Sequence, residues 1–357
     1  MSLYDKVCCT VLVCFLLIGI DSQTIAKEAN STSQPAMIWP RKIRPGDTIM
    51  FVASASPLSR DSIMVTKGRL EKRGYKVKLD EAMFSEYGFL AGTDERRAEE
   101  LMRAFQDKEV DAIFSGRGGY GVMRILDSLD YDVIRENPKV LTGYSDITAL
   151  HLAINKKAGL VTFHSPNGVW GDDDEPNLPA FAEEYFYKAL QQSEGDDQGY
   201  VIKPSQEVPQ PEGIGKGKAR GRLTGGNLSL VVSLMGTPYE IDTAGAILMI
   251  EDTREAPYRV DRMLCQLKLA GKLDTLKGAV LGQFTENYDR EKDQMTEDER
   301  FSVTGVLRQY FEPLDIPVLI NYPIGHHPAN AAVPMGGMVE VDADAATLRI
   351  LPPTAKP

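Results

Sequence analysis

One serine in the chain has the setting of a nucleophile. Ser145 lies in "VLTGYSDITAL", where an apolar stretch passes through a glycine into the serine and then directly into a helical pattern. A sharp turn from strand to helix exposes a hydroxyl and brings it close to the amides and positive potential of a helix N-terminus. Ile147 stands where a G-x-S-x-G motif has its last glycine. The alternative is that Ser145 or Asp146 only caps the helix.

A serine nucleophile needs a base, and the chain has four histidines. His151 is on the helix after Ser145 and is expected to point away from the hydroxyl, whereas His164 ends a predicted strand and could form a wall of the site. His326 and His327 lie in "NYPIGHHPANAAVPMG", a Gly- and Pro-bounded loop after a strand. Such loops often carry functional histidines, so the pair is the favoured source of the base, and spacing does not choose between them.

A histidine base is usually oriented by a carboxylate. The stretch "GAILMIEDTREAPYRVDRML" places Glu251 and Asp252 directly after an apolar strand. Burying an unpaired charge is costly, so these acids need partners. Helix capping, or pairing with Arg254 or Arg259, is the alternative to a catalytic role. The order serine, acid, histidine is one of several that unrelated folds use for a triad.

The stretch "IFSGRGGYGVMRIL" contains a G-x-G-x-x-G pattern at Gly116, Gly118 and Gly121. A dinucleotide-binding loop belongs to the βαβ unit that opens its domain. Here the loop follows the third predicted strand, and the next strand leads into Ser145. We therefore predict that the loop brings a backbone N–H close to Ser145, as part of an oxyanion hole.

The elements that must position these residues follow an alternating pattern. From Arg41 to Trp170, short apolar runs alternate with helical stretches such as "TDERRAEELMRAFQD", which Thr93 can cap. This alternation is typical of a parallel sheet with helices on both faces. An acidic, then Pro- and Gly-rich linker (171–215) leads to a second domain (216–352) that ends in a predicted hairpin. The predicted fold class is α/β, an N-terminal parallel-sheet α/β domain (41–170) followed by a smaller β-rich α+β domain.

Composition and charge limit the possible functions of the protein and its possible cellular location. A net charge of −11 disfavours nucleic acid as a partner, because nucleic acid requires a basic face. Residues 1–38 form an apolar segment (7–20) and a polar spacer. The apolar segment has the length of a signal-peptide core, which favours export, with a membrane anchor or a cytoplasmic protein as alternatives. Cys265 is the one cysteine outside this segment and is expected in the core; no Cys/His spacing predicts a metal site.

Six stretches in order together resemble the LD-carboxypeptidase, or muramoyltetrapeptide carboxypeptidase, family of serine peptidases. They are "LAGTDERRAEEL", "GRGGYGVMRIL", "NPKVLTGYSDITALH", "LTGGNLSLVVSLMGTPYEID", "IEDTREAPYRVDRML" and "PIGHHPANAAVPMG". The resemblance implies an enzyme without metal or cofactor that releases terminal D-alanine from the L,D-linked tetrapeptide of peptidoglycan. It also implies a homodimer with its site where the two domains meet.

The same resemblance assigns roles to residues. It implies Ser145 as nucleophile, Glu251 as the carboxylate and His326 as the base, with His327 as the fallback. The backbone amides of Gly119 and Asp146 would form the oxyanion hole. Ser165 is a departure, because family members often have glycine at this point of an "HGP" motif.

The sequence identifies the substrate-binding residues less directly than the triad candidates. A carboxypeptidase must bind a free carboxylate, which suggests an arginine, and Arg117 in the glycine loop is our candidate. Some family members instead cleave the acyl-adenylate linkage of a peptide-nucleotide antibiotic and give immunity, and Trp170 could stack on the adenine in that case. A non-catalytic binding protein is disfavoured because all three triad candidates are present. Export would direct the enzyme to periplasmic peptides or the wall, and a cytoplasmic location to recycled muropeptides.

Overall fold

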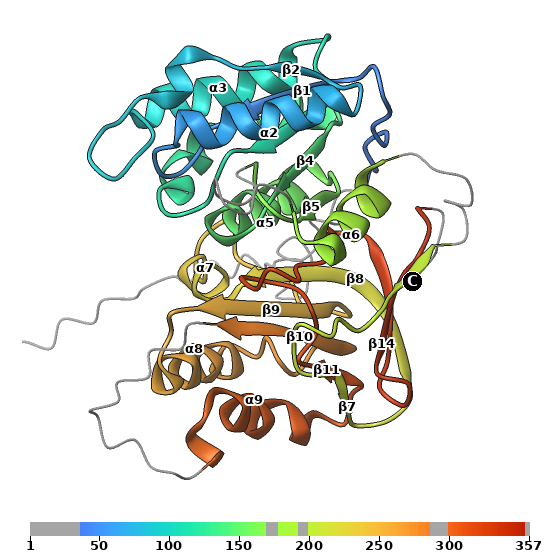
Figure 1. The fold of residues 1–357 in the computed structure, drawn as a ribbon. Helices are drawn as coiled ribbons and strands as arrows, with labels where there is room; N and C mark the ends of the chain where they lie inside the picture. Colours follow the sequence, from blue (N-terminus) through green and yellow to red (C-terminus); the bar gives the residue numbers. More distant parts are fainter. Residues whose placement is uncertain (1–35, 169–177, 192–198, 286–298, 354–357) are drawn as a thin grey trace, which may run out of the picture. The chain divides into compact units, whose positions relative to one another are not determined.

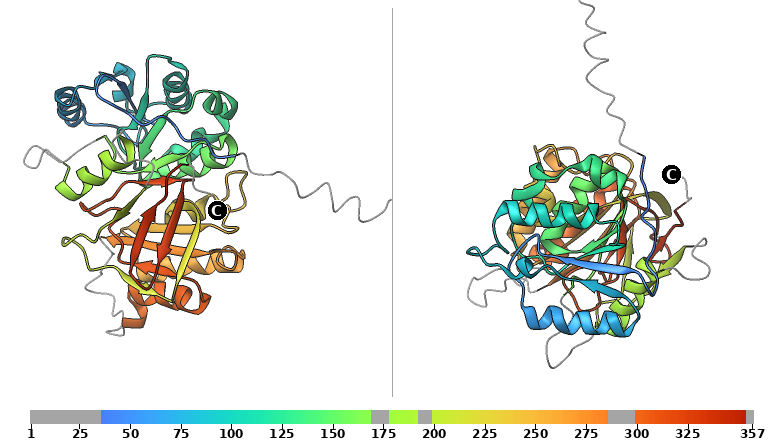
Figure 2. Two further views of the ribbon diagram at one scale, coloured as in Figure 1. Left: turned by 90° about the vertical axis from the view of Figure 1, so that its right-hand side faces the viewer. Right: turned by 90° about the horizontal axis from the view of Figure 1, so that it is seen from above.

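The computed structural model describes residues 36–168, 178–191, 199–285 and 299–353, which belong to one compact unit. Two β-sheets and the helices that cover them make up this unit, and both can be followed in Figures 1 and 2. The apolar segment 7–20 and Trp170 lie outside the described residues. Among the residues described, no helix is long and apolar enough to cross a membrane.

The first sheet is parallel except at one edge. Its strand order is β12-β5-β4-β3-β1-β2. The strands are β1 (Thr48–Val52), β2 (Lys76–Lys78), β3 (Ala112–Ser115), β4 (Val140–Gly143), β5 (Thr162–His164) and β12 (Val333–Met335). All neighbours pair in parallel apart from β12, which runs antiparallel to β5. A strand from the C-terminal part of the chain therefore completes the N-terminal sheet.

Alternate residues of β1 enter different cores, as a strand buried on both faces requires. Met50 and Val52 join one hydrophobic cluster, and Ile49 and Phe51 join another. The first cluster includes residues of α3 (Asp94–Gln106) and α5 (Thr148–Ala158); the second includes residues of α2 (Arg60–Lys72) and α6 (Ala180–Leu190). The prediction of helices on both faces of a parallel sheet is confirmed. The side chain of Thr93 caps α3 as expected, accepting a hydrogen bond from Arg96 N at 3.3 Å.

The second sheet mixes parallel and antiparallel strands in the order β6-β14-β13-β8-β9-β10-β11-β7. Its strands are β6 (Tyr200–Ile202), β7 (Glu212–Ile214), β8 (Lys218–Asn227), β9 (Ile247–Thr253), β10 (Gly278–Thr285), β11 (Val318–Ile320), β13 (Met338–Asp342) and β14 (Thr347–Ile350). The stretch from β8 to β11 is parallel, and the other pairs are antiparallel, including the predicted hairpin of β13 and β14. The predicted fold class is confirmed.

Helices cover one face of the second sheet (Figure 1). They are α7 (Leu228–Ser233), α8 (Pro257–Leu269) and α9 (Val303–Phe311). Their buried residues share one cluster with α3 and α5, so a continuous core joins the two sheets. The domain bounds given above stay a prediction.

The stretch after the glycine loop is a 3-10 helix, η2 (Val122–Ser128), followed by the short α4 (Tyr131–Glu136). One local expectation needs correction. Cys265 is only partly buried on α8, so it is not a core residue.

Candidate active site

Ser145 occupies a sharp turn at the carboxyl end of β4. Its φ is 64°, a left-handed conformation that costs a non-glycine residue roughly 1–2 kcal/mol. The residue opens a short 3-10 helix, η3 (Ser145–Ile147), which runs directly into α5. The cap residues of η3 and α5 are Tyr144 and Ile147, and the Asp146 carboxylate instead accepts a hydrogen bond from Val122 N at 2.8 Å. Neither Ser145 nor Asp146 therefore caps the helix that follows it, and the Asp146 carboxylate instead holds the first amide of η2.

The glycine loop lies against this serine, because β3 and β4 are neighbouring parallel strands. A Cβ atom on Gly118 would come within 2.7 Å of Ser145 Cβ and 3.1 Å of its Oγ. Gly119 has a φ of 112°, and Tyr120 N donates to Ser56 Oγ at 3.1 Å. Only a residue without a side chain allows this approach at Gly118, so the backbone of the loop borders the Ser145 hydroxyl.

Replacing Gly118 by alanine is expected to lower kcat by about 10²–10³-fold, the typical effect of losing one oxyanion-hole donor. The added methyl group cannot stay 2.7 Å from Ser145 Cβ, so the loop and its amides must move away. Steady-state kinetics with a peptide substrate checks this. Gly68→Ala on α2 is the matched control, because a Cβ there meets nothing within 4 Å. A Gly118→Ala enzyme with unchanged kcat would contradict the proposed role of the loop.

Glu251 and His326 form a buried pair. Glu251 lies near the end of β9 and is fully buried, and its Oε2 is 2.5 Å from His326 Nδ1. Burial raises the pKa of Glu251, and the hydrogen bond from His326 opposes this effect. Gly325 allows the approach, because a Cβ there would lie 2.8 Å from Glu251 Oε2. When Nδ1 donates to the carboxylate, Nε2 is the ring nitrogen left to accept a proton.

The neighbouring acid has a different environment. Asp252 accepts hydrogen bonds from Asn227 Nδ2 at 2.8 Å and from Ser229 N and Oγ at 2.9 and 2.8 Å. These bonds fix the turn from β8 into α7. Arg259 approaches Glu255, at 3.6 Å, and not either of these acids. Of the two adjacent acids near the end of β9, only Glu251 therefore contacts a histidine.

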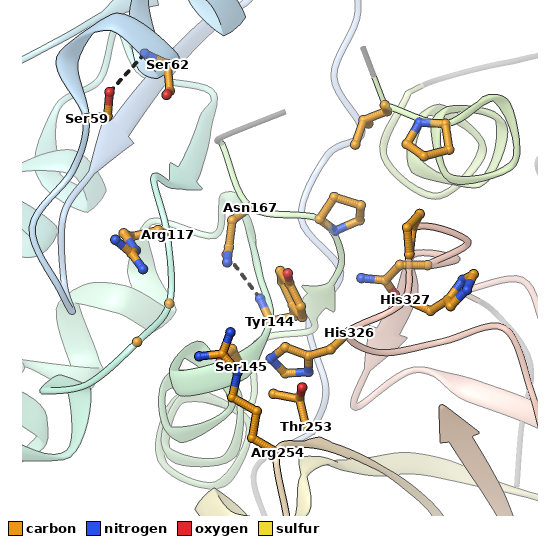
Figure 3. A pocket seen from close by; sticks show the side chains of 17 residues that line it. Ser59, Ser62, Arg117, Tyr144, Ser145, Asn167, Thr253, Arg254, His326 and His327 are labelled. Atoms are coloured by element: carbon orange, nitrogen blue, oxygen red, sulfur yellow. Dashed lines mark hydrogen bonds between the residues drawn. The ribbon is translucent and has the colours of Figure 1, made fainter. Parts of the chain in front are cut away.

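A cavity of about 860 Å³ contains Ser145 and His326 (Figure 3). The ring centroids of Tyr144 and His326 are 4.7 Å apart. His327 also lines the cavity, but its Nδ1 accepts a hydrogen bond from Ala329 N at 3.1 Å, and Figure 3 shows it farther from Ser145. The other lining residues are Ser59, Ser62, Arg117, Gly118, Gly119, Tyr144, Pro166, Asn167, Leu178, Pro179, Thr253, Arg254, Pro328 and Asn330.

The other two histidines do not border the cavity. His151 is fully buried, with Nε2 2.9 Å from the Gly143 carbonyl oxygen and Nδ1 2.9 Å from Thr162 Oγ1. A carbonyl can only accept, so Nε2 carries the proton and Nδ1 accepts from the hydroxyl. His164 is also fully buried, with its ring centroid 6.0 Å from that of Tyr144. The expectation that His164 forms a wall of the site is wrong, because Tyr144 takes that place.

We expect the buried His151 to make the stability of the fold depend on pH. Burial lowers the pKa of His151 to about 4. The unfolded chain, with a histidine pKa of about 6.5, binds the proton first on acidification, so stability present above pH 6.5 is lost as the pH falls towards 4. We expect this group to account for about 3 kcal/mol of that loss. Chemical denaturation of wild type and His151→Gln at pH 7 and pH 4 measures it, and a stability difference that does not change with pH would contradict it.

Several lining residues were not predicted from the sequence. Asn167 follows β5 and accepts a hydrogen bond from Tyr144 N at 3.2 Å, which supports the turn before Ser145. Its position after a parallel strand is a signal that could have identified it. Arg254 was considered only as a partner for an acid, whereas it lines the cavity with Arg117.

The fold and this site define a two-sheet α/β hydrolase of the serine type. Family models described as the N-terminal and C-terminal domains of LD-carboxypeptidase match residues 49–165 and 220–341. The chain belongs to the LD-carboxypeptidase family and is a serine-type carboxypeptidase.

Relatives by sequence and by structure agree with this assignment. A Bacillus subtilis (strain 168) protein named "Probable murein peptide carboxypeptidase" is 39% identical over 301 residues, covering 83% of this chain and 89% of the relative. The crystal structure of muramoyltetrapeptide carboxypeptidase from Oxalobacter formigenes is 29% identical with a TM-score of 0.72, covering 85% and 97% of the two chains. The Escherichia coli microcin C7 self-immunity protein MccF is 28% identical over 345 residues, covering 87% of this chain and 94% of the relative.

Proposed function

We propose that this protein is a metal-independent carboxypeptidase that hydrolyses the L,D-peptide bond holding the terminal D-alanine of peptidoglycan tetrapeptides. Ser145 is the nucleophile, His326 the base, and Glu251 the carboxylate that orients it. The observation that carries this proposal is the shared cavity, which is lined by both a strained serine and an acid-paired histidine.

In the proposed reaction, His326 Nε2 accepts the Ser145 proton as the hydroxyl attacks the scissile carbonyl. The buried Glu251 carboxylate keeps Nδ1 protonated and stabilises the imidazolium that forms. The amides of Gly119 and Asp146 donate to the oxyanion, since one lies in the glycine loop and the other in the first turn of η3, directly after Ser145. His326 then protonates the leaving amine, D-alanine departs, and water hydrolyses the acyl-enzyme.

The substrate class is supported by the relatives and by the cavity. Two of the relatives are named for murein peptide or muramoyltetrapeptide carboxypeptidase activity. The cavity of about 860 Å³ is large enough for a peptide of a few residues, and Arg117 in its lining can bind a substrate carboxylate. We also propose export directed by residues 7–20 and a homodimer, to be tested by cell fractionation and by light scattering.

A second activity is favoured by other relatives. A structure of MccF in complex with aspartyl sulfamoyl adenosine has a TM-score of 0.78 and 26% identity, covering 88% of this chain and 98% of that one. The same triad could hydrolyse an acyl-adenylate linkage. Trp170, our candidate platform for the adenine, lies outside the described residues.

The two activities are separated by assaying purified protein with two substrates. One is a defined L-Ala-γ-D-Glu-L-diamino acid-D-Ala tetrapeptide, and the other is a peptidyl-adenylate analogue. We expect D-alanine release from the tetrapeptide. Hydrolysis of the adenylate alone would replace the proposed function with the immunity activity, and hydrolysis of neither would exclude both.

A further inference from the structure

The charge of the cavity differs from that of the whole protein. The chain carries a net charge of −11, yet the described lining residues include two arginines, Arg117 and Arg254, and neither Asp nor Glu. Burial lowers the pKa of His327, so this histidine adds little positive charge. A cavity lined by two guanidinium groups favours a ligand with more than one carboxylate.

Arg254 has an unusual backbone. It directly follows β9, the strand that carries Glu251, and its φ is 62°. Glycine or asparagine adopts this left-handed conformation more readily than arginine does. Arg254 N donates to the Thr285 carbonyl at 3.0 Å, which ties the strained residue to the neighbouring strand. Strain of this kind is typical of functional positions, where the side chain must point in one direction.

The two arginines lie at different ends of the cavity. Figure 3 shows the Arg254 guanidinium pointing towards the Ser145 and His326 end, whereas Arg117 lies towards Ser59 and Ser62. Arg117 Nη1 donates to the Pro57 carbonyl at 3.3 Å, on the loop before α2. Each arginine can therefore meet a different part of one extended substrate.

The reaction decides which part each arginine meets. The base must protonate the leaving amine, so the leaving residue lies on the His326 side, and the scissile oxygen faces the glycine loop. In a carboxypeptidase the free carboxylate belongs to that leaving residue, and bond lengths place its carbon within about 4 Å of the scissile carbonyl carbon. A group that binds it must therefore lie close to Ser145 and His326, which is the position of Arg254.

On the basis of the proposed function, we propose that Arg254 binds the C-terminal carboxylate of the leaving residue and restricts the enzyme to terminal bonds. Arg117 then binds a second carboxylate, which belongs to the part of the substrate on the acyl side of the scissile bond. In a peptidoglycan tetrapeptide, the free α-carboxylate of the γ-linked D-glutamate has that chemistry. This assignment replaces the role expected for Arg117 from the sequence, where Arg117 was the candidate for binding the C-terminal carboxylate.

The test compares a tetrapeptide that has a free C-terminus with the same peptide ending in a carboxamide. Wild type is expected to prefer the free acid. Arg254→Asn is expected to lower kcat/KM for the acid by about 10–100-fold, and to leave kcat/KM for the amide within about threefold, so that the preference disappears. Asparagine tolerates the left-handed backbone, so the turn is kept. Arg254→Lys, which keeps the charge but not the two-pronged geometry, should retain part of the preference.

Controls separate this inference from the proposed function. Arg259→Asn, an exposed arginine outside the cavity, should behave as wild type. Arg117→Asn should lower kcat/KM for both peptides alike. An Arg254→Asn enzyme that keeps the full preference, or an Arg117→Asn enzyme that loses it, overturns the inference while D-alanine release by wild type upholds the function. A wild type that releases neither D-alanine nor its amide overturns both.

Discussion

Replacing Ser145 by alanine is expected to lower kcat for D-alanine release by at least about 10⁴-fold, with little change in the folded state. Removal of a nucleophile from a serine hydrolase leaves only the catalysis that the oxyanion hole and binding provide. Alanine keeps the Cβ that packs near Gly118, so the loop has no reason to move. The measurement is the rate of D-alanine release, with circular dichroism to verify folding.

Ser62→Ala is the matched control for this experiment. Ser62 lines the same cavity, but at the end away from His326, so its loss should change kcat by no more than a fewfold. A fluorophosphonate probe, which labels activated serines, should modify wild type and Ser62→Ala but not Ser145→Ala. Undiminished release or labelling after Ser145→Ala would mean that another group is the nucleophile.

The features predictable from the sequence are those set by short stretches of chain. Strand β1, the capped helix α3 and the hairpin of β13 and β14 each follow from local periodicity and turn residues. The turn at Ser145 was also predictable from a short stretch, because a strand, a glycine, a serine and a helix follow one another within a dozen residues. Predicting that the glycine loop lies next to Ser145 required one further rule, which is that strands that follow one another in the sequence tend to be neighbours in a parallel sheet.

The features that could not be predicted depend on contacts between distant segments. The pairing of β12 with β5 joins residues that are about 170 positions apart, and no local pattern indicates it. His326 and His327 are adjacent in the sequence, and only the tertiary position of Glu251 distinguishes them. Arg254 was missed because its direction depends on a left-handed φ, which an arginine in a sequence does not signal.

Replacing Glu251 by glutamine is expected to lower kcat by about 10³–10⁴-fold while KM changes little. The side chain keeps its shape, but a neutral amide no longer stabilises the imidazolium or fixes its tautomer. Because burial raises the pKa of Glu251, removing the charge also removes a desolvation cost, so the variant should be at least as stable as wild type. Thermal melts and steady-state kinetics on the same preparations measure both quantities.

Asp252→Asn separates catalysis from structure at the end of this strand. The Asp252 carboxylate accepts four hydrogen bonds, and an amide group there would direct its N–H towards other donors. We expect this variant to lose about 1–3 kcal/mol of stability while kcat stays within about tenfold of wild type. The two adjacent acids would then differ in what they affect: replacing Glu251 would lower kcat, and replacing Asp252 would lower the stability of the fold. If Glu251→Gln instead lowered stability and spared kcat, Glu251 would be a structural acid, and the histidine would need another partner.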